Sequence, residues 1–353
     1  MSQQIEQDTS YVASLRAIAL GELSLNGLLT SAAALTEQGQ PAQAINLYKA
    51  WIKSNNGNAM LHVALFNCSV LESALNDHAA VVRSLSAAVS LEPNFLPAYV
   101  NLGSAYEKLG DPNKAIEIWK IAVGRPVTAG PTTVGYLTTL YKQIARVYAD
   151  LMMPDMAEQA VVQCLALAPH HKDAMEQYVA FRLAQCKWPS VEPIDTLDAV
   201  SIVETMHPLS AAVYTDDPLL QLATAERYVR KTCSKTAAPG PNDRRAAPVD
   251  LTSRRLRIGY VSSDLRDHAV GYLMAELFER HDRNAVEVFA YYCGIPSQSE
   301  LTLRTKAAIE HWREIRDLSN EAAAAMIAKD GIDILVDVNG HTRDAKLGIF
   351  ALR

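Results

Sequence analysis

The sequence lacks the glycine-rich motifs that mark the commonest nucleotide-binding folds. Neither GxGxxG nor GxxxxGK[ST] occurs in its 353 residues, so it has no dinucleotide fingerprint and no P-loop. These absences argue against a dehydrogenase and against a nucleoside triphosphatase. Excess positive charge is also missing. The formal net charge is −6, which offers no basic field to attract nucleic acid or an anionic membrane, and we expect neither as a partner.

Paired cysteines and long apolar runs are missing as well. The cysteines never form a CxxC pair, which favours reduced thiols in a cytoplasmic protein over disulfides or structural zinc. They are Cys68, Cys164, Cys186, Cys233 and Cys293. No run reaches the roughly 20 apolar residues of a membrane helix, and the polar start MSQQIEQDTS is no signal peptide. We expect a cytoplasmic protein that uses no metal and no cofactor.

What the first half contains is a repeated pair of short helices. In the template, residues 99–126, two predicted helices flank the turn LGDP at 109–112. Its patterned positions are Tyr99, Leu102, Gly103, Tyr106, Ala115, Trp119 and Ala122. The small residues let the helices approach closely, and the large ones fill the space between neighbouring pairs. The same offsets recur 34 residues earlier, at Leu65 and Cys68 and then at Leu85 and Ala88.

This period and these residue types resemble the tetratricopeptide repeat. We expect four helical hairpins between residues 25 and 170 and a half repeat at 171–185. One hairpin cannot bury its own apolar face, so several stack into an α-solenoid. The Tyr and Trp side chains at the packing offsets are expected in the core and not at a ligand. The concave groove of such an array commonly holds an extended peptide.

The last hundred residues change to an alternation of strands and helices. Strands are expected at 257–261, 286–292, 312–315 and 332–338, with helices between them. This order predicts a parallel sheet of the Rossmann-like type. In such open sheets, ligands gather beyond the carboxyl ends of the strands, so the loops after the first and last strands are the candidate site.

Both loops carry polar residues. The first holds Asp264 and His268, and the second holds Asp337, Asn339 and His341. An imidazole titrates near neutral pH and can accept a proton from a hydroxyl group. Taken by themselves, however, the residues favour a solvated or helix-capping role for His268.

Three stretches of this segment resemble the start of the catalytic domain of O-linked N-acetylglucosamine transferases, including the plant SPINDLY proteins. They are LRIGYVSSDLRDHAVGYL, EVFAYYCG and DGIDILVDVNGHTRDAKLGIFALR. The preceding HPLSAAVYTDDPLLQLATAERY resembles the segment that joins repeats to catalysis in that family. The resemblance implies two Rossmann-like lobes, the second of which binds most of the UDP-N-acetylglucosamine. The donor sugar is either N-acetylglucosamine or, as in SPINDLY, fucose.

The resemblance also implies a site. A Ser or Thr hydroxyl of an acceptor protein, held by the repeat groove, attacks the anomeric carbon of the sugar. His268 then lies in the active cleft as a catalytic base or a positioning group. Asp264, Asp337, Asn339 and His341 are candidates to line the cleft. A capping role for Asp264 and a turn-closing role for Asp337 and Asn339 stay open as alternatives.

The sequence therefore predicts a fold of the α plus α/β class, a repeat solenoid followed by a partial Rossmann-like lobe. The expected domains are an N-terminal helical segment (1–24), the repeat array (25–185), a helical connector (186–233), a linker (234–250) and an incomplete first lobe (251–353). Because family members continue into a second, donor-binding lobe, we expect this chain to be truncated and inactive alone.

The predicted function is that of the N-terminal part of a protein O-glycosyltransferase. The enzyme would transfer N-acetylglucosamine from UDP-N-acetylglucosamine to Ser or Thr, with acceptor proteins bound by the repeats. The alternative is a non-catalytic repeat adaptor that carries a vestigial catalytic lobe. A complete small enzyme built on the half-sheet is a third possibility, against which the uncovered apolar sheet argues.

Overall fold

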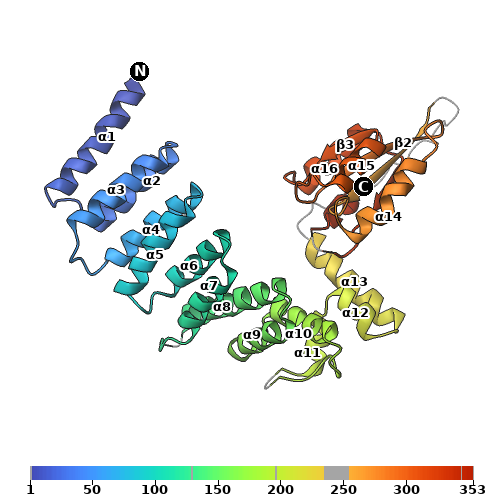
Figure 1. Cartoon of the computed structure of the whole chain (residues 1–353), viewed down its shortest axis with the longest axis horizontal. Coiled ribbons are helices and arrows are strands. Elements are labelled where there is room, and N and C mark those ends of the chain that lie inside the picture. Colours follow the sequence, from blue (N-terminus) through green and yellow to red (C-terminus); the bar gives the residue numbers. More distant parts are fainter. Residues whose placement is uncertain (1, 129, 195–196, 234–253, 343, 353) are drawn as a thin grey trace. The chain divides into compact units, whose positions relative to one another are not determined.

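The computed structural model divides the chain into a helical unit, Met1–Thr205, and an α/β unit, Met206–Arg353 (Figure 1). The residues that it describes are 2–128, 130–194, 197–233, 254–342 and 344–352. The predicted fold class, a repeat solenoid followed by a Rossmann-like lobe, is confirmed. The predicted linker at 234–250 lies outside the described residues.

Stacked helix pairs build the first unit. Its helices are α1 (Ser2–Ala19), α2 (Leu25–Glu37), α3 (Pro41–Ser54), α4 (Leu61–Ala74), α5 (His78–Leu91), α6 (Leu96–Lys108), α7 (Pro112–Val123), α8 (Pro131–Asp150), α9 (Pro154–Leu167), α10 (Lys172–Ala184) and α11 (Ala199–Thr205). The pairs α2–α3, α4–α5, α6–α7 and α8–α9 are in direct contact and are the four predicted hairpins. Helix α10 occupies the predicted half repeat.

Close helix approach explains the small residue at position 103. A Cβ atom on Gly103 would lie 2.1 Å from Nε1 of Trp119, so only glycine leaves room for the indole. Trp119 is fully buried, and its Nε1 donates a hydrogen bond to the Val100 carbonyl oxygen at 3.2 Å. Trp51 and Tyr99 are buried too, which confirms that the large aromatic residues of the repeats pack in the core.

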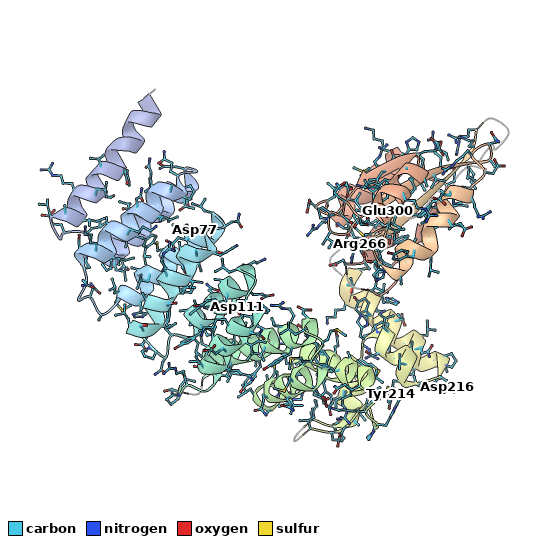
Figure 2. All side chains as sticks on the ribbon, viewed as in Figure 1. Asp77, Asp111, Tyr214, Asp216, Arg266 and Glu300 are labelled. Atoms are coloured by element: carbon cyan, nitrogen blue, oxygen red, sulfur yellow. The ribbon has the colours of Figure 1, made fainter. Side chains whose placement is uncertain are left out.

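The residues that cap the helix N-termini recur along the array, as the core residues do. Asp77 and Asp111, labelled in Figure 2, are the N-cap residues of α5 and α7. Each side chain accepts a hydrogen bond at 2.9 Å from the backbone N–H three residues later, in Ala80 and Lys114. A carboxylate that caps a helix satisfies an otherwise unpaired amide and favours the positive end of the helix dipole. The two caps therefore set equivalent starts for successive second helices.

The predicted connector, 186–233, is shared by the two units. Helix α11 is part of the first unit, whereas α12 (Pro208–Tyr214) and α13 (Pro218–Cys233) are part of the second. Helix α13 contacts the last helix, α17 (Leu347–Ala351). The domain limits given from the sequence stay predictions.

A four-stranded parallel sheet forms the centre of the second unit. Its strands are β1 (Leu256–Ser262), β2 (Val286–Tyr292), β3 (His311–Glu314) and β4 (Ile334–Asp337), in the order β3-β2-β1-β4. The remaining helices are α14 (Ala269–Arg280), α15 (Glu300–Ala308) and α16 (Asn320–Lys329). The parallel sheet and the alternation of strands with helices are as the sequence predicted, whereas the strand order was not predicted.

Apolar side chains pack on both faces of this sheet at β1 and β2, whereas Ile334 of the edge strand β4 stays 46% exposed. On one face Phe278 of α14 packs with Val288 and Ala290 of β2. On the other face Ile327 of α16 packs with Phe289 of β2 and with Ile349 of α17. The core is therefore layered as helix, sheet and helix, which leaves the loops at the carboxyl ends of the strands free to carry polar residues.

Three of the cysteines are buried thiols. Burial raises the pKa of Cys68 and of Cys293 to about 12, and that of Cys164 to about 11. These side chains behave as small apolar groups and not as nucleophiles, because a thiol must ionise to react. Among the described residues, no helix combines the length and the apolar content that crossing a bilayer demands.

Candidate functional site

The two predicted site loops meet at one edge of the sheet. β1 and β4 pair in parallel, with Val261 beside Asp337, so the loop after β1 and the loop after β4 leave the sheet side by side. The buried side chain of Asn339 joins them. Its Oδ1 accepts a hydrogen bond from the Ser263 N–H at 2.7 Å, and its Nδ2 lies 2.8 Å from both Ser263 Oγ and Asp264 Oδ2. Asp264 and Asn339, which the sequence placed in two separate candidate loops, are thus in direct contact.

Asp264 is held from several sides. Its side chain is only 9% exposed, and besides the Asn339 amide it faces Arg266, whose Nη2 lies 3.7 Å from Oδ1. Its own backbone N–H donates to Ser262 Oγ at 3.0 Å. A buried carboxylate is costly unless it is paired and hydrogen-bonded, and these neighbours meet that need. Asp264 therefore anchors the loop that leads to His268.

His268 stands at the start of α14 as its N-cap residue. Its Nδ1 accepts a hydrogen bond from the Val270 N–H at 3.3 Å, and the same nitrogen lies 3.9 Å from Asp264 Oδ2. The side chain is 41% exposed, so solvent and solute reach the ring. The capping role that the residues alone favoured is present, together with access to the rim.

The two neighbours of Nδ1 require opposite protonation. The Val270 amide needs an unprotonated Nδ1, which places the proton of the neutral ring on Nε2. Asp264 instead favours a protonated Nδ1, which leaves Nε2 free to accept a proton, the arrangement of a histidine base oriented by a carboxylate. The closer contact is the one to Val270. An unprotonated Nε2 is therefore available only when Nδ1 turns from the amide towards Asp264.

Asp337 closes the turn after β4. Its Oδ1 accepts hydrogen bonds from the backbone N–H groups of Asn339 at 2.9 Å and of Gly340 at 3.0 Å, and Gly340 has a φ of +60°, which glycine adopts without strain. The carboxylate thus shapes the loop that presents Asn339. This contact matches the turn-closing alternative stated for Asp337.

His341 packs against the helices that precede the sheet. Its ring meets Tyr228 of α13 edge-on, with centroids 5.3 Å apart, and Tyr228 meets His207, the N-cap of α12, at 4.8 Å. Burial lowers the pKa of His207, and the nearby His341 and Lys231 lower it further. The three rings form a column, here called the aromatic column, that fixes α12 and α13 on the second site loop.

Sequence reasoning missed Ser263, Arg266 and Tyr228. Ser263 and Arg266 lie within two residues of Asp264 in the chain. Their polar side chains in a predicted site loop were the sequence signal that could have identified them. Tyr228 lies in a helix far from the site in sequence, and only the fold brings it to His341. No group of three or more His, Cys, Asp or Glu side chains in the described part of the chain is arranged to hold a metal ion.

Fold and rim together define a class: a tetratricopeptide repeat array followed by a parallel α/β unit with a histidine at its carboxyl-end rim. Residues 200–353 match the model of glycosyl transferase family 41, and residues 96–119 match that of the tetratricopeptide repeat. The resemblance to O-linked N-acetylglucosamine transferases and SPINDLY proteins is therefore confirmed.

Curated relatives carry the same names. The chain is 33% identical over 159 residues to the probable UDP-N-acetylglucosamine–peptide N-acetylglucosaminyltransferase SEC of Arabidopsis thaliana, over 44% of this chain and 16% of that protein. It is 42% identical over 101 residues to a Caenorhabditis elegans protein named as the same transferase, over 28% of this chain and 9% of the relative. A SPINDLY protein of Oryza sativa is 35% identical over 107 residues, 29% of this chain and 11% of the relative.

Among solved structures, a mutant O-GlcNAc transferase of Thermobaculum terrenum aligns with 83% of this chain and 48% of its own, at 24% identity and a TM-score of 0.48. The chain thus matches from a tenth to a sixth of the length of these curated relatives and about half of that solved chain.

Proposed function

We propose that these residues form part of a protein O-glycosyltransferase that transfers N-acetylglucosamine from UDP-N-acetylglucosamine to Ser or Thr hydroxyl groups. The observation that carries the proposal is the placement of His268 beside Asp264 at the joint carboxyl edge of β1 and β4. That segment lies within the part of the chain that matches glycosyl transferase family 41. An accessible imidazole that a neighbouring carboxylate orients can accept the proton of an acceptor hydroxyl group.

The acceptor is proposed to lie along α2, α4 and α6. One cavity is lined by residues of α2 and α4, including Asn67, and a second by residues of α4 and α6, including Asn101. Val70 lines both, so the two cavities adjoin as one groove. Asn67 and Asn101 are 34 residues apart in the sequence and therefore equivalent in the repeat. An Asn amide both donates and accepts, which suits the backbone of an extended peptide.

Removal of His268 tests the chemistry. In the protein isolated from its own cells, we expect His268→Ala to lower the rate of N-acetylglucosamine transfer by about 10²–10⁴-fold, the usual contribution of a general base. Radiolabelled UDP-N-acetylglucosamine and a fucose nucleotide, supplied in parallel, report which sugar reaches protein. His281→Ala is the matched control, since His281 caps the opposite end of α14. Equal loss in both variants, or no loss in His268→Ala, contradicts the proposed role.

Tested as these 353 residues alone, the chain is expected to show no transfer. The regions that match the named transferases are a small share of those proteins, and the described sheet carries none of the glycine-rich nucleotide motifs. Turnover of UDP-N-acetylglucosamine by the purified chain contradicts this expectation. The cytoplasmic location stays a prediction.

Peptide binding by the groove is tested separately. We expect Asn101→Ala to weaken binding of a fluorescein-labelled, serine- and threonine-rich peptide about fivefold, because about 1 kcal/mol of hydrogen bonding is lost. Fluorescence anisotropy measures the affinity, and Asn113→Ala on the exposed side of α7 is the control. Equal affinity in the wild type and both variants places the peptide elsewhere. Binding without any transfer by the protein from its own cells favours the adaptor alternative.

A further inference from the structure

A cavity of about 740 Å³ opens at the carboxyl edge of the sheet. Loops from all four strand ends contribute to its wall. The residues that line it are Arg266, Cys293, Ile295, Arg316, Asp317, Asn320, Asp344, Ala345 and Lys346. The described residues that line it include none of the five site residues predicted from the sequence. In open parallel sheets, a crevice at this edge is where ligands collect.

Positive charge exceeds negative charge in this wall. Arg266, Arg316 and Lys346 face Asp317 and Asp344, an excess of one positive charge within a chain whose formal net charge is −6. The cavity is therefore locally opposite in sign to the protein as a whole. A local excess of this kind attracts an anion against the overall field.

The arginine side chains have donors to spare. The contact of Arg266 with Asp264, at 3.7 Å, is longer than a hydrogen bond, and its buried Nε has no partner among the described residues. Arg316 is exposed, and no ion pair joins it to any residue that the structure describes. Figure 2 marks Arg266 within the α/β unit. A guanidinium group presents a planar fork of donors that matches the oxygens of a phosphoryl group.

Two hydrogen bonds between loops fix the positions of the residues that form the cavity wall. Lys346 Nζ donates to the Leu318 carbonyl oxygen at 2.6 Å and joins the loop after β4 to the loop after β3. Cys293 Sγ donates to the Asp344 carbonyl oxygen at 3.6 Å and joins the same loop to the end of β2. The N-terminal residue of α16, Asn320, also lines the cavity, so the helix dipole adds partial positive charge. A preformed wall lowers the entropic cost of binding.

We infer that this cavity binds the phosphoryl group of a small phosphorylated metabolite through Arg266 and Arg316. The two carboxylates of the wall then accept hydrogen bonds from hydroxyl groups of the same ligand, as a sugar carries. The chemistry fits a phosphate monoester and the diphosphate of a nucleotide alike. The inference does not depend on the transfer reaction, because it concerns binding to this unit alone.

Isothermal titration calorimetry of the 353-residue chain at low ionic strength tests it. The probes are inorganic phosphate, glucose 6-phosphate and uridine diphosphate, each titrated separately. We expect one site per chain and a loss of about tenfold in affinity in Arg316→Gln and in Arg266→Gln, as for one charged hydrogen bond. Tighter binding of glucose 6-phosphate identifies a monoester as the ligand, and tighter binding of uridine diphosphate identifies a nucleotide.

Arg304→Gln is the matched control, because Arg304 lies on α15 and pairs with Glu279. Circular dichroism checks that every variant is folded. Arg316 is exposed, so its variant keeps the test valid even when Arg266→Gln disturbs its loop. The inference is overturned when the wild type binds none of the probes up to about 10 mM, or when both variants bind as tightly as Arg304→Gln. No outcome depends on whether the chain transfers a sugar.

Discussion

At the scale of single residues, Asn339 is the tie between the two site loops. Its amide satisfies the Ser263 backbone N–H and the Asp264 carboxylate, both buried. The sequence placed Asn339 in the right loop but left open whether it had a function or closed a turn. The structure shows that Asp337 bonds the backbone of the turn, whereas the Asn339 side chain bonds Thr342 in the same turn and also reaches across to the loop after β1. That distinction depends on a contact between segments 75 residues apart, which local sequence patterns do not record.

Loss of this amide is expected to destabilise the α/β unit. Asn339→Ala leaves a buried N–H and a buried carboxylate without their partner, at a cost of about 3 kcal/mol in the free energy of unfolding. Urea unfolding followed by circular dichroism measures the change. Asn284→Ala, at an exposed position of the same unit, is expected to change stability by less than about 0.5 kcal/mol. Equal stability of the two variants would show that water replaces the Asn339 contacts.

His268 shows how one residue serves two predicted roles. As the cap of α14 it satisfies a backbone amide, and as a neighbour of Asp264 it lies where a base can be oriented. The sequence alone could not separate these roles, because a histidine at the start of a helix after a strand is compatible with both. Their separation depends on which partner Nδ1 faces, a difference of side-chain rotation.

At the scale of elements, α6 and α7 approach each other closely where Gly103 faces Trp119. The 34-residue period was visible in the sequence because every hairpin solves the same packing problem with the same residue sizes. The strands were visible as apolar runs for a similar reason. Helix α17 was not predicted, because its five residues are too few to show a period.

Gly103→Ala is expected to loosen this hairpin. The added Cβ would overlap Trp119, so helix α6 or the indole must shift, at a cost of about 1–3 kcal/mol. Differential scanning calorimetry measures the lowered melting temperature of the repeat unit. Gly57→Ala adds the same methyl group where nothing lies within 4 Å and serves as the control. A Gly103→Ala protein as stable as the Gly57→Ala protein contradicts the packing described for Trp119.

The packing of α12 and α13 on the loop after β4 is expected to depend on pH through His207. Burial first, and then His341 and Lys231, lower the pKa of His207 below its ordinary value of 6.5. The unfolded chain therefore binds the proton more readily than the folded one. The resulting stability is fully present above pH 6.5 and is lost as the pH falls through the folded pKa.

His207→Asn isolates this dependence. In place of His207 Nδ1, which accepts a hydrogen bond from the Leu209 N–H, asparagine offers a side-chain oxygen as the acceptor for α12 and does not titrate. Between pH 7.5 and pH 5.5 we expect the wild type to lose more of its unfolding free energy than the variant, in urea titrations at each pH. Other titrating groups, such as His281, act equally in both proteins and cancel in the difference. If the unfolding free energies of the wild type and the variant change equally with pH, the charge of His207 does not affect the stability of the aromatic column.

At the scale of the whole molecule, the order of the two architectures could be predicted from the sequence, whereas the contacts made by the connector helices could not. The connector was predicted as one segment because its proline-broken helices look alike. The structure assigns α11 to the repeats and α12 and α13 to the α/β unit. The deciding contacts, such as that of Tyr228 with His341, join residues far apart in the sequence, and no local period reports them.

Asn67 and Asn101 present the same amide one repeat apart along the groove. A strand bound as proposed and shifted by one repeat length would meet the same donor and acceptor again, so the two asparagines would offer two similar registers. Binding of this kind would depend on the backbone of the peptide and would tolerate many side-chain sequences. Under the proposed function, discrimination between neighbouring hydroxyl groups on one acceptor would fall to the geometry around His268, and the repeats would supply residence time in place of sequence selectivity.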